Sequence, residues 1–291
     1  MPPKTSARTG PLVPAGPGKP GVGEADSRTV GRAARTPADP DVRRNATLDR
    51  GLDILELFLD RADSLTIAEI SQKLSIPQSS VYRIVWSMRN REWLTLERPH
   101  TYRLGNRLLH AVVRAESQSS LIRQGQAVLE SLTAQTTETS LLTMVSGVHV
   151  VCLLRVEGTQ TIRASFQPGA LLPLHAGASS TVLLAFSSDQ LIDQVCASEL
   201  VRYSPATVTD PTQLRAKLAD TRRQGYASSE GEVDRGVTSV AAPVLTWPTS
   251  PAVAAVSIVA PSARFGEAEL ARATALVIDA AGQLERALRG A

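Results

Sequence analysis

The residues that could do chemistry in this chain are few, and they suit binding better than catalysis. Its histidines are His100, His110, His149 and His175. They lack the His-x-x-x-His spacing of a metal site, and the cysteines are not paired along the sequence. The sequence also contains neither a glycine-rich phosphate loop nor a Gly-x-Ser-x-Gly elbow. We therefore predict no catalytic residue, no metal ion and no cofactor, and we expect that the protein is not an enzyme.

Acidic side chains cluster at Glu230, Glu232 and Asp234, in the segment SSEGEVDRG. A carboxylate here could act as a general base, and a solvated loop explains the cluster equally well. No histidine or lysine lies within reach along the sequence to complete an acid–base pair. Both interpretations remain open on the residues alone.

A second candidate site is the segment LLPLHAGASSTVLLAF, which begins at Leu171. Its Pro-Leu-His-Ala turn leads into Gly-Ala-Ser-Ser at the predicted start of a helix. Free backbone N–H groups and hydroxyls then lie beside apolar side chains, a combination that suits a small anionic ligand. An ordinary helix cap is the alternative.

Polar residues at Gln78, Ser79, Ser80, Tyr82 and Arg83 share the outward face and exposed first turn of a predicted helix. Small polar residues, an aromatic residue and an arginine suit base edges and phosphates. Their neighbours Val81, Ile84, Val85 and Met88 are predicted to point inward. We therefore predict that this helix enters a DNA groove, with an ordinary surface helix as the alternative.

Two further elements must hold this helix in place. Ile67, Ile70 and Leu74 form one apolar stripe on a preceding helix, and Thr66 with Glu69 has the pattern of a capping box. A Ser-Ile-Pro break separates the two helices, and its Pro77 suits the first turn of the second. The order predicts a helix-turn-helix.

A predicted β-hairpin follows, and its Pro99-His100 turn is flanked by Arg98 and Arg103. This wing would place both arginines at phosphates or in the minor groove. From Lys73 to Arg103 there are six basic residues against Glu92 and Glu97, although residues 47–104 are neutral overall. The half expected to face DNA is therefore positive.

A helix upstream carries Leu48, Leu52, Leu55 and Leu59 at helical spacing, and this stripe is expected to pack on the other two helices. Three helices and a wing make a domain over residues 47–105, about 60 residues, which is large enough to fold alone only marginally.

Residues 1–46 hold eight of the 18 prolines and six of the 19 glycines, so we predict a disordered tail. Its basic residues suit either non-specific phosphate contacts or no role at all. It lacks the apolar region of a signal peptide, and the chain has no run of 18 apolar residues that would span a membrane. Cys152 and Cys196 lie in apolar sequence, which indicates buried free thiols in a reducing cytoplasm.

The rest of the chain predicts a second domain. Residues 106–120 are expected to form a linker helix, and a further helix follows from Leu121. Strands are predicted in TSLLTMVSG, VHVVCLLRVEG, TQTIRASF, TSVAAPVLTW and AVAAVSIVA, with helices near residues 179–186, 189–197 and 211–224 and at the C-terminus. Short turns between strands indicate an α+β domain with a largely antiparallel sheet over residues 121–291.

The order of these motifs resembles the IclR family of bacterial transcriptional regulators. The matching segments are LDRGLDILELF, LTIAEISQKLSIPQSSVYRIV, YRLG, LPLHAGASSTVLLAF, GYASSEGEVDRGVTSVAAPV and AAVSIVAP, over about residues 45–289. The resemblance implies a winged helix-turn-helix followed by a GAF-like effector-binding and oligomerisation domain. It also implies a homodimer or a dimer of dimers that binds a double-stranded DNA operator, and a small, often carboxylate-bearing effector.

Effector contacts are implied only where the family motifs align. The implied positions are Leu172, Leu174, Ala178, Ser179, Ser229, Glu230, Ser239 and Ser257. The chain departs from the family at Ser180 and Thr181, where many members have Gly-Lys, and at Val259 and Ala260 in the last strand. These departures indicate a less polar effector than a two- or three-carbon acid.

The sequence favours a ligand-responsive transcriptional regulator, a repressor that senses a small organic acid. An architectural DNA-binding protein would need the wing domain but no cavity. A metabolite enzyme fused to a DNA-binding module would need an acid–base pair, which the large domain does not display in its sequence.

Overall fold

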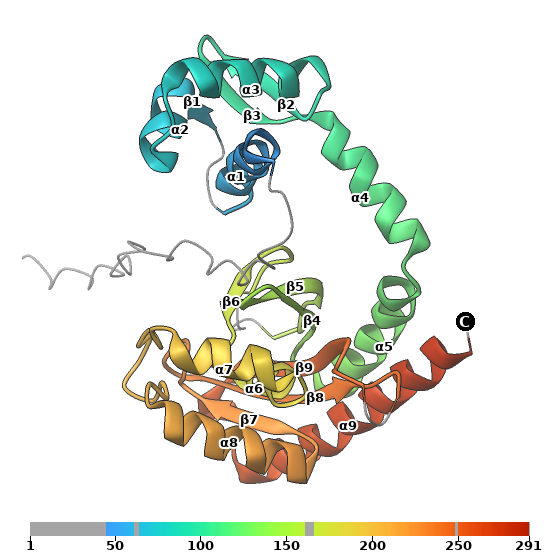
Figure 1. Cartoon of the computed structure of the whole chain (residues 1–291). Coiled ribbons are helices and arrows are strands. Elements are labelled where there is room, and N and C mark those ends of the chain that lie inside the picture. The colour runs from blue at the N-terminus through green and yellow to red at the C-terminus, as the bar shows by residue number, and fades with distance from the viewer. Residues whose placement is uncertain (1–44, 61–63, 161–165, 248–249, 291) are drawn as a thin grey trace, which may run out of the picture. The chain divides into compact units, whose positions relative to one another are not determined.

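The computed structural model describes residues 45–60, 64–160, 166–247 and 250–290 (Figure 1). The predicted tail, residues 1–46, therefore lies outside the described part of the chain, apart from its last two residues. Within that part, no helix combines the length and the apolar character needed to cross a membrane.

The first helix, α1 (Ala46–Asp60), packs through a different face from the one its leucines predict. Leu48, Leu52 and Leu59 are exposed, whereas Ile54 and Phe58 are buried in the core of the first domain. The predicted leucine stripe is therefore wrong, apart from Leu55, which packs partly buried against that core.

Helix α2 (Ile67–Leu74) begins with the predicted capping box. The Thr66 hydroxyl accepts from the Glu69 N–H at 3.2 Å, and the Glu69 carboxylate accepts from the Thr66 N–H at 2.7 Å. The hydrogen bonds that the Glu69 carboxylate accepts from the Thr66 N–H and from the Thr66 hydroxyl lower the pKa of Glu69. The helix ends at Ser75, whose left-handed backbone (φ 56°) turns the chain toward α3 (Gln78–Asn90). Pro77 is the N-cap of α3 and not, as predicted, a residue of its first turn.

The wing consists of β2 (Leu94–Arg98) and β3 (Thr101–Leu104), and the two-residue strand β1 (Leu65–Thr66) pairs with the other edge of β3. Gly105 ends the wing where the backbone passes very close to Glu92: a Cβ at Gly105 would lie 2.1 Å from the Glu92 carbonyl oxygen. The core beneath the wing and helices contains the predicted inward residues Ile70, Val81 and Val85.

The chain continues into α4 (Asn106–Gln118) and α5 (Ser120–Thr136). After α5, six strands form one antiparallel sheet in the order β6-β5-β4-β9-β8-β7 (Figure 1). The strands are β4 (Thr139–Ser146), β5 (His149–Val156), β6 (Leu171–Pro173), β7 (Ala227–Glu230), β8 (Val237–Val244) and β9 (Ala254–Pro261).

Helices cover both faces of this sheet. One face packs on α5 and on the long α9 (Glu267–Arg289), which follows the short 3-10 helix η1 (Ser262–Arg264); Leu142, Val240 and Ile258 belong to that core. The other face packs on α6 (Ala178–Ala185), with α7 (Asp189–Ala197) and α8 (Pro211–Gln224) beyond it. Side chains alternate between the two cores along each strand, so neighbouring residues of a strand serve different cores.

The predicted α+β class, with a winged helix-turn-helix and a largely antiparallel sheet, is confirmed. The short edge strands β6 and β7 were missed, since each has too few residues to show an alternating pattern. A strand predicted at TQTIRASF lies mostly outside the described residues, because positions 161–165 are not described; the described Thr159 and Gln160 form a bend.

Candidate functional site

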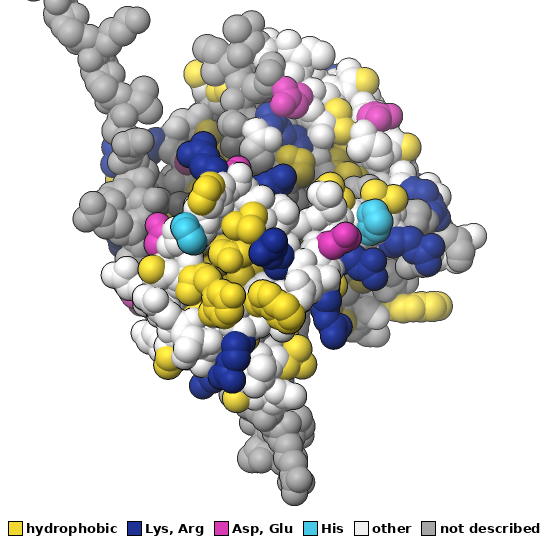
Figure 2. All heavy atoms as spheres, turned by 90° about the horizontal axis from the view of Figure 1, so that it is seen from above, with side chains coloured by type: hydrophobic (Ala, Val, Ile, Leu, Met, Phe, Trp, Pro, Cys, Tyr) yellow, Lys and Arg dark blue, Asp and Glu magenta, His cyan; other side chains and the backbone are white. Residues whose placement is uncertain are grey.

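The outward face of α3 exposes the residue types that its sequence predicts. Tyr82 is 55% exposed and Trp86 is 53% exposed, and Arg83 lies on the surface beside them. Seen from above, hydrophobic side chains gather at the centre of this side of the molecule, with lysine and arginine side chains around them (Figure 2). The exposed Tyr82 and Trp86 beside Arg83 can contact both bases and phosphates.

The first turn of α3 leaves backbone donors available. Its N-cap is Pro77, which provides no capping side chain, and the N–H groups of Ser80 and Val81 donate to the Pro77 carbonyl oxygen at 2.9 and 3.1 Å. The N–H groups of Gln78 and Ser79 precede these bonds at the positive end of the helix dipole. A phosphate is well matched to such a helix start.

The wing places Arg98 and Arg103 on its exposed surface. Arg103 pairs in register with Thr95, and Arg98 pairs with Thr101 at the hairpin end. The turn between the strands contains His100 with φ 65°, a left-handed backbone that allows the sharp reversal. Both arginines therefore project from a short hairpin whose register shifts between Leu96 and Arg98.

Replacing both Arg98 and Arg103 by glutamine is expected to weaken binding to all DNA sequences alike. Each lost phosphate contact removes about 0.9 from the slope of log K against log salt, so the double variant should reduce that slope by up to about two units. Fluorescence anisotropy at several salt concentrations measures the slope. A changed sequence preference with an unchanged slope would contradict a phosphate-binding role.

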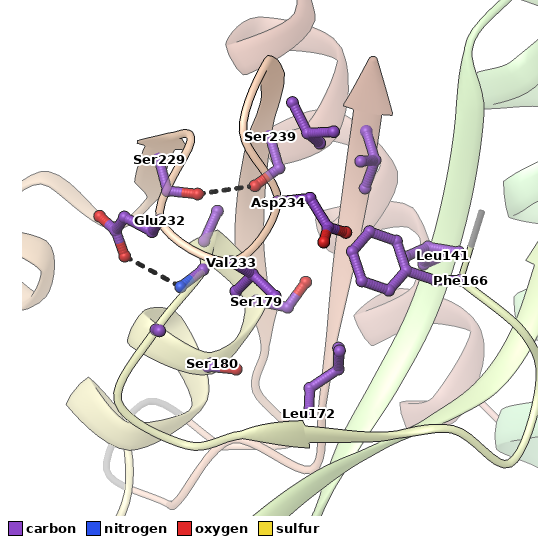
Figure 3. Close-up of a pocket in the computed structure, with 15 residues that line it drawn as sticks. Leu141, Phe166, Leu172, Ser179, Ser180, Ser229, Glu232, Val233, Asp234 and Ser239 are labelled. Atoms are coloured by element: carbon purple, nitrogen blue, oxygen red, sulfur yellow. Dashed lines mark hydrogen bonds between the residues drawn. The ribbon is translucent and has the colours of Figure 1, made fainter. Parts of the chain in front are cut away.

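The second candidate site is a cleft on the α6 side of the large sheet (Figure 3). Its walls come from five strands of the sheet (β4, β6, β7, β8 and β9), from the start of α6 and from the loop between β7 and β8. The lining residues are Leu141, Phe166, Leu172, Ala176, Gly177, Ala178, Ser179, Ser180, Ser229, Glu232, Val233, Asp234, Val237, Ser239 and Val259. The cleft thus joins an apolar wall to a group of hydroxyls and carboxylates.

A buried carboxylate holds the start of α6. Gly177 is the N-cap with φ 92°, a backbone conformation that glycine adopts without strain, and its N–H donates to Glu232 Oε2 at 2.9 Å. The other oxygen, Glu232 Oε1, accepts from Lys217 Nζ of α8 at 2.5 Å. The Thr207 hydroxyl donates to the Glu232 backbone carbonyl at 2.6 Å. Lys217 is therefore the charged partner that the sequence did not reveal.

Hydroxyls form the polar part of the cleft. Ser229 Oγ and Ser239 Oγ lie 2.9 Å apart on the paired strands β7 and β8. Ser180 Oγ, on the third residue of α6, is buried without a hydrogen-bond partner in the described structure. These hydroxyls can orient a polar ligand group.

The structure brings together five of the eight residues predicted to bind an effector. They are Leu172, Ala178, Ser179, Ser229 and Ser239. The other three do not line the cleft: Leu174 is buried in the core beneath α6, Glu230 is exposed at the end of β7, and Ser257 is fully buried within β9. Contacts of the effector with all eight residues stay a prediction, and these three lie outside the lining of this cleft.

Sequence reasoning missed the apolar wall of the cleft. Leu141, Val259 and Ser239 lie on the same face of neighbouring strands. Val259 of β9 pairs directly with Ser239 of β8, and it is two residues from Ser257, which pairs with Leu141 of β4. The alternation of each strand was visible in the sequence, but the register between strands was not. Phe166 joins this wall from the segment before β6.

Titratable groups outside the cleft give little support for a reactive thiol, a catalytic histidine or a metal site. Burial raises the pKa of the Cys152 thiol to about 11, and burial also raises that of Cys196, so neither forms a thiolate readily near neutral pH. Burial lowers the pKa of His175, whose Nε2 lies 2.9 Å from the Val201 carbonyl oxygen. Among the described residues, no group of histidine, cysteine and carboxylate side chains is arranged to hold a metal ion.

A winged helix-turn-helix with an exposed, basic and aromatic face on α3, joined to a domain whose cleft has hydroxyls beside an apolar wall, defines a class of DNA-binding regulators. The family model of the IclR helix-turn-helix domain matches residues 47–98, and that of the bacterial transcriptional regulator IclR C-terminal domain matches residues 113–286. The chain belongs to the IclR family of transcriptional regulators, which are not enzymes.

Individual relatives agree with this assignment. The chain is 30% identical over 244 residues to the HTH-type transcriptional regulator KipR of Bacillus subtilis, covering 84% of this chain and 97% of the relative. A crystal structure of an IclR regulator from Silicibacter superposes with a TM-score of 0.79 at 25% identity, over 84% of this chain and 97% of the other. An IclR homologue from Microbacterium hydrocarbonoxydans, complexed with 4-hydroxybenzoate, has a TM-score of 0.73 at 26% identity, over 84% of this chain and 100% of the other.

Proposed function

We propose that this regulator is a ligand-responsive repressor that senses a small organic acid in the cytoplasm. In this proposal, residues 47–105 bind operator DNA, residues 106–120 link the domains, and residues 121–291 bind the effector and oligomerise as a dimer or a dimer of dimers. The observation that carries the proposal is the cleft, in which hydroxyls and the start of α6 lie beside an apolar wall. An architectural protein would have no use for such a cleft.

The DNA-binding half of the proposal rests on the exposed face of α3 and on the wing. Gln78, Ser79, Ser80, Tyr82 and Arg83 are assigned to the major groove, and the wing arginines to the backbone or minor groove. Repression follows simply if the bound protein occupies a site that the polymerase needs.

The effector-binding half is supported by the homologue that binds 4-hydroxybenzoate, an aromatic acid. A ligand of that kind has a carboxylate for the helix start and a ring for the apolar wall. It can alter DNA binding only through its different affinity for two arrangements of the regulator. We expect a coupling of about 1–3 kcal/mol, roughly five- to 150-fold in operator affinity.

Selection of bound duplexes from a random-sequence DNA library tests the function directly, because it needs no known operator. The enriched duplex is then titrated with the full chain, with and without small aliphatic and aromatic acids. An acid-dependent change in operator affinity is the expected result. Enrichment without any acid response would favour the architectural alternative, and chemical conversion of an added acid would favour the enzyme alternative.

Ser239→Leu is expected to abolish the response to an active acid while sparing operator binding by the free protein. The leucine side chain would fill the cleft beside Ser229 and Val259. Ser228→Leu is the matched control, because Ser228 is exposed on the opposite face of β7. If Ser239→Leu responds at wild-type acid concentrations, the effector binds elsewhere. Ser257 is not suitable for this test, since a larger side chain at a fully buried position would disturb the packing.

A further inference from the structure

One exposed aromatic side chain on α3 is not among the residues assigned to DNA. Ser79, Arg83 and Trp86 recur at i, i+4 and i+7, and all three are exposed. They therefore share one stripe of the helix, opposite the buried side chains of Val81 and Val85. Trp86 lies in line with Arg83 on the outward face, so a partner that contacts Arg83 along this stripe also meets the Trp86 ring.

Trp86 presents an apolar surface to its surroundings. The residue is 53% exposed, and Tyr82, about one helical turn earlier, is 55% exposed. Apart from the indole N–H, the tryptophan side chain offers no hydrogen-bonding group. Covering these two neighbouring rings would remove apolar surface from water, which favours a partner that has apolar groups of its own.

The charges around Trp86 indicate that this partner is DNA. Helix α3 carries Arg83 and Arg89 and, over its fully described length, no aspartate or glutamate. The segment from Lys73 to Arg103 contains six basic residues against two acidic ones. A surface with cations and few carboxylates is complementary to the phosphates of a duplex.

Duplex DNA offers one kind of apolar group at the base edges of its major groove. Guanine, adenine and cytosine present hydrogen-bond acceptors and donors there, whereas thymine also presents its C5-methyl group. The indole ring of Trp86 can pack on that methyl group by apolar contact. Its single N–H donor cannot form the two hydrogen bonds by which arginine recognises guanine. Of the four bases, thymine therefore fits Trp86.

The spacing along α3 also determines where this thymine would lie. Trp86 follows Arg83 by three residues, and a helix rises about 1.5 Å per residue, so the two side chains start about 4.5 Å apart along the helix axis. Successive bases of one DNA strand are about 3.4 Å apart. A helix that lies along the groove therefore holds Trp86 about one or two base steps from the base that Arg83 contacts.

We propose that Trp86 recognises the C5-methyl group of a thymine that lies about one or two base steps from the base contacted by Arg83. Trp86 thereby selects thymine at a defined position of the operator, while Arg83 and the first turn of α3 contact its neighbours. The inference rests on the placement of α3 in the major groove proposed above, and it adds a selecting residue and the base that this residue selects.

Deoxyuridine tests this contact, because uracil differs from thymine only by the missing methyl group. In the duplex enriched by selection, thymines are replaced one at a time, and the affinity of the full chain is measured by fluorescence anisotropy. One replacement near the base contacted by Arg83 should weaken binding about three- to fivefold, the effect of losing one buried methyl group. In Trp86→Ala, the thymine and uracil duplexes should bind equally. This variant should also keep the wild-type salt slope, since it removes no charge.

Trp247→Ala is the matched control, because Trp247 is a 66% exposed tryptophan in the segment between β8 and β9, outside the DNA-binding domain. It should keep the full uracil effect. Trp86→Gln is a second test variant, since glutamine keeps a side chain of some length but has no apolar ring. It should lose the uracil effect as the alanine variant does, and it decides the question if the alanine variant binds too weakly to titrate.

Three outcomes would overturn the inference. The wild type could bind every uracil duplex as tightly as the thymine duplex. The uracil effect could persist in the Trp86 variants, which would assign it to the stiffness of the DNA. The Trp86 variants could also weaken thymine and uracil duplexes by the same factor and leave the difference between them intact, which would place the ring on a sugar or phosphate.

The acid response of the same duplex separates this inference from the proposed function. A uracil effect that depends on Trp86, without any acid response, would contradict the ligand-responsive function and not the thymine contact. An acid response without a uracil effect would have the opposite meaning. If the selection enriches no duplex, sequence-specific binding itself is contradicted, and both proposals fail.

Discussion

Arg83→Ala is expected to weaken binding to the selected operator by roughly five- to 150-fold while leaving the fold intact. Arg83 lies on the exposed face of α3, next to the exposed Tyr82 and before the partly buried Ile84. A bidentate contact from arginine to guanine contributes about 1–3 kcal/mol of discrimination against other bases. Because the side chain is exposed in the free protein, its loss should cost little stability. Anisotropy titrations with the operator and with single-base variants measure the effect.

Arg83→Lys separates base recognition from simple charge. Lysine keeps the positive charge but lacks the planar fork that binds two acceptors of guanine. If Arg83 recognises a base, the lysine variant should lose most of the discrimination and keep the salt dependence of the wild type. Recovery of full sequence discrimination by lysine, or unchanged affinity of the alanine variant, would remove Arg83 from the base-reading face.

The helix-turn-helix was predictable because its signals are local. The Thr66–Glu69 capping box, the inward spacing of Val81 and Val85, and the Pro99-His100 turn each involve residues close in sequence. Such short-range patterns can be recognised in a single sequence, because the structures they predict depend little on distant residues. The orientation of α1, in contrast, depends on its contacts with α3, which is distant in sequence.

In α1, the leucines do recur at helical spacing, but the helix packs on α3 through the face that contains Gly51. Gly51 lies against Ile84 and Met88 of α3, and a Cβ at Gly51 would already be 3.3 Å from the Met88 methyl group. This close approach turns the Gly51, Ile54 and Phe58 face inward and leaves Leu48 and Leu52 exposed. A pattern of apolar residues alone cannot choose between two faces of one helix when a glycine permits tighter packing on one of them.

The candidate cleft was predictable only in part for a similar reason. The serines and the start of α6 carried a local motif, so Ser179 and Ser239 were found. The neighbours that give the cleft its character depend on strand register and on helix packing, as with Leu141 opposite β9 and Lys217 from α8. Burial of the Glu232 carboxylate is visible only once those elements are assembled.

That buried carboxylate is expected to be a large contributor to the stability of the effector domain. Glu232 is 8% exposed, and Glu232→Ala would leave Lys217 without its charged partner and the Gly177 N–H without its acceptor. Removing one partner of a buried ion pair costs about 3–5 kcal/mol. The Lys217 side chain is 21% exposed and can recover some hydration, so we expect a loss of about 2–4 kcal/mol in the free energy of unfolding.

Urea titration of the full chain, followed by hydrogen–deuterium exchange in peptides from α6 and α8, measures this loss in the domain concerned. Glu230→Ala is the matched control, because that exposed carboxylate should change the stability by less than about 0.5 kcal/mol. In the double variant Glu232→Ala, Lys217→Ala, the loss should be smaller than the sum of the two single losses, since each single variant leaves a partner uncompensated. Additive losses would mean that the carboxylate and the ammonium group do not stabilise each other, and that Glu232 acts on α6 through the Gly177 N–H alone.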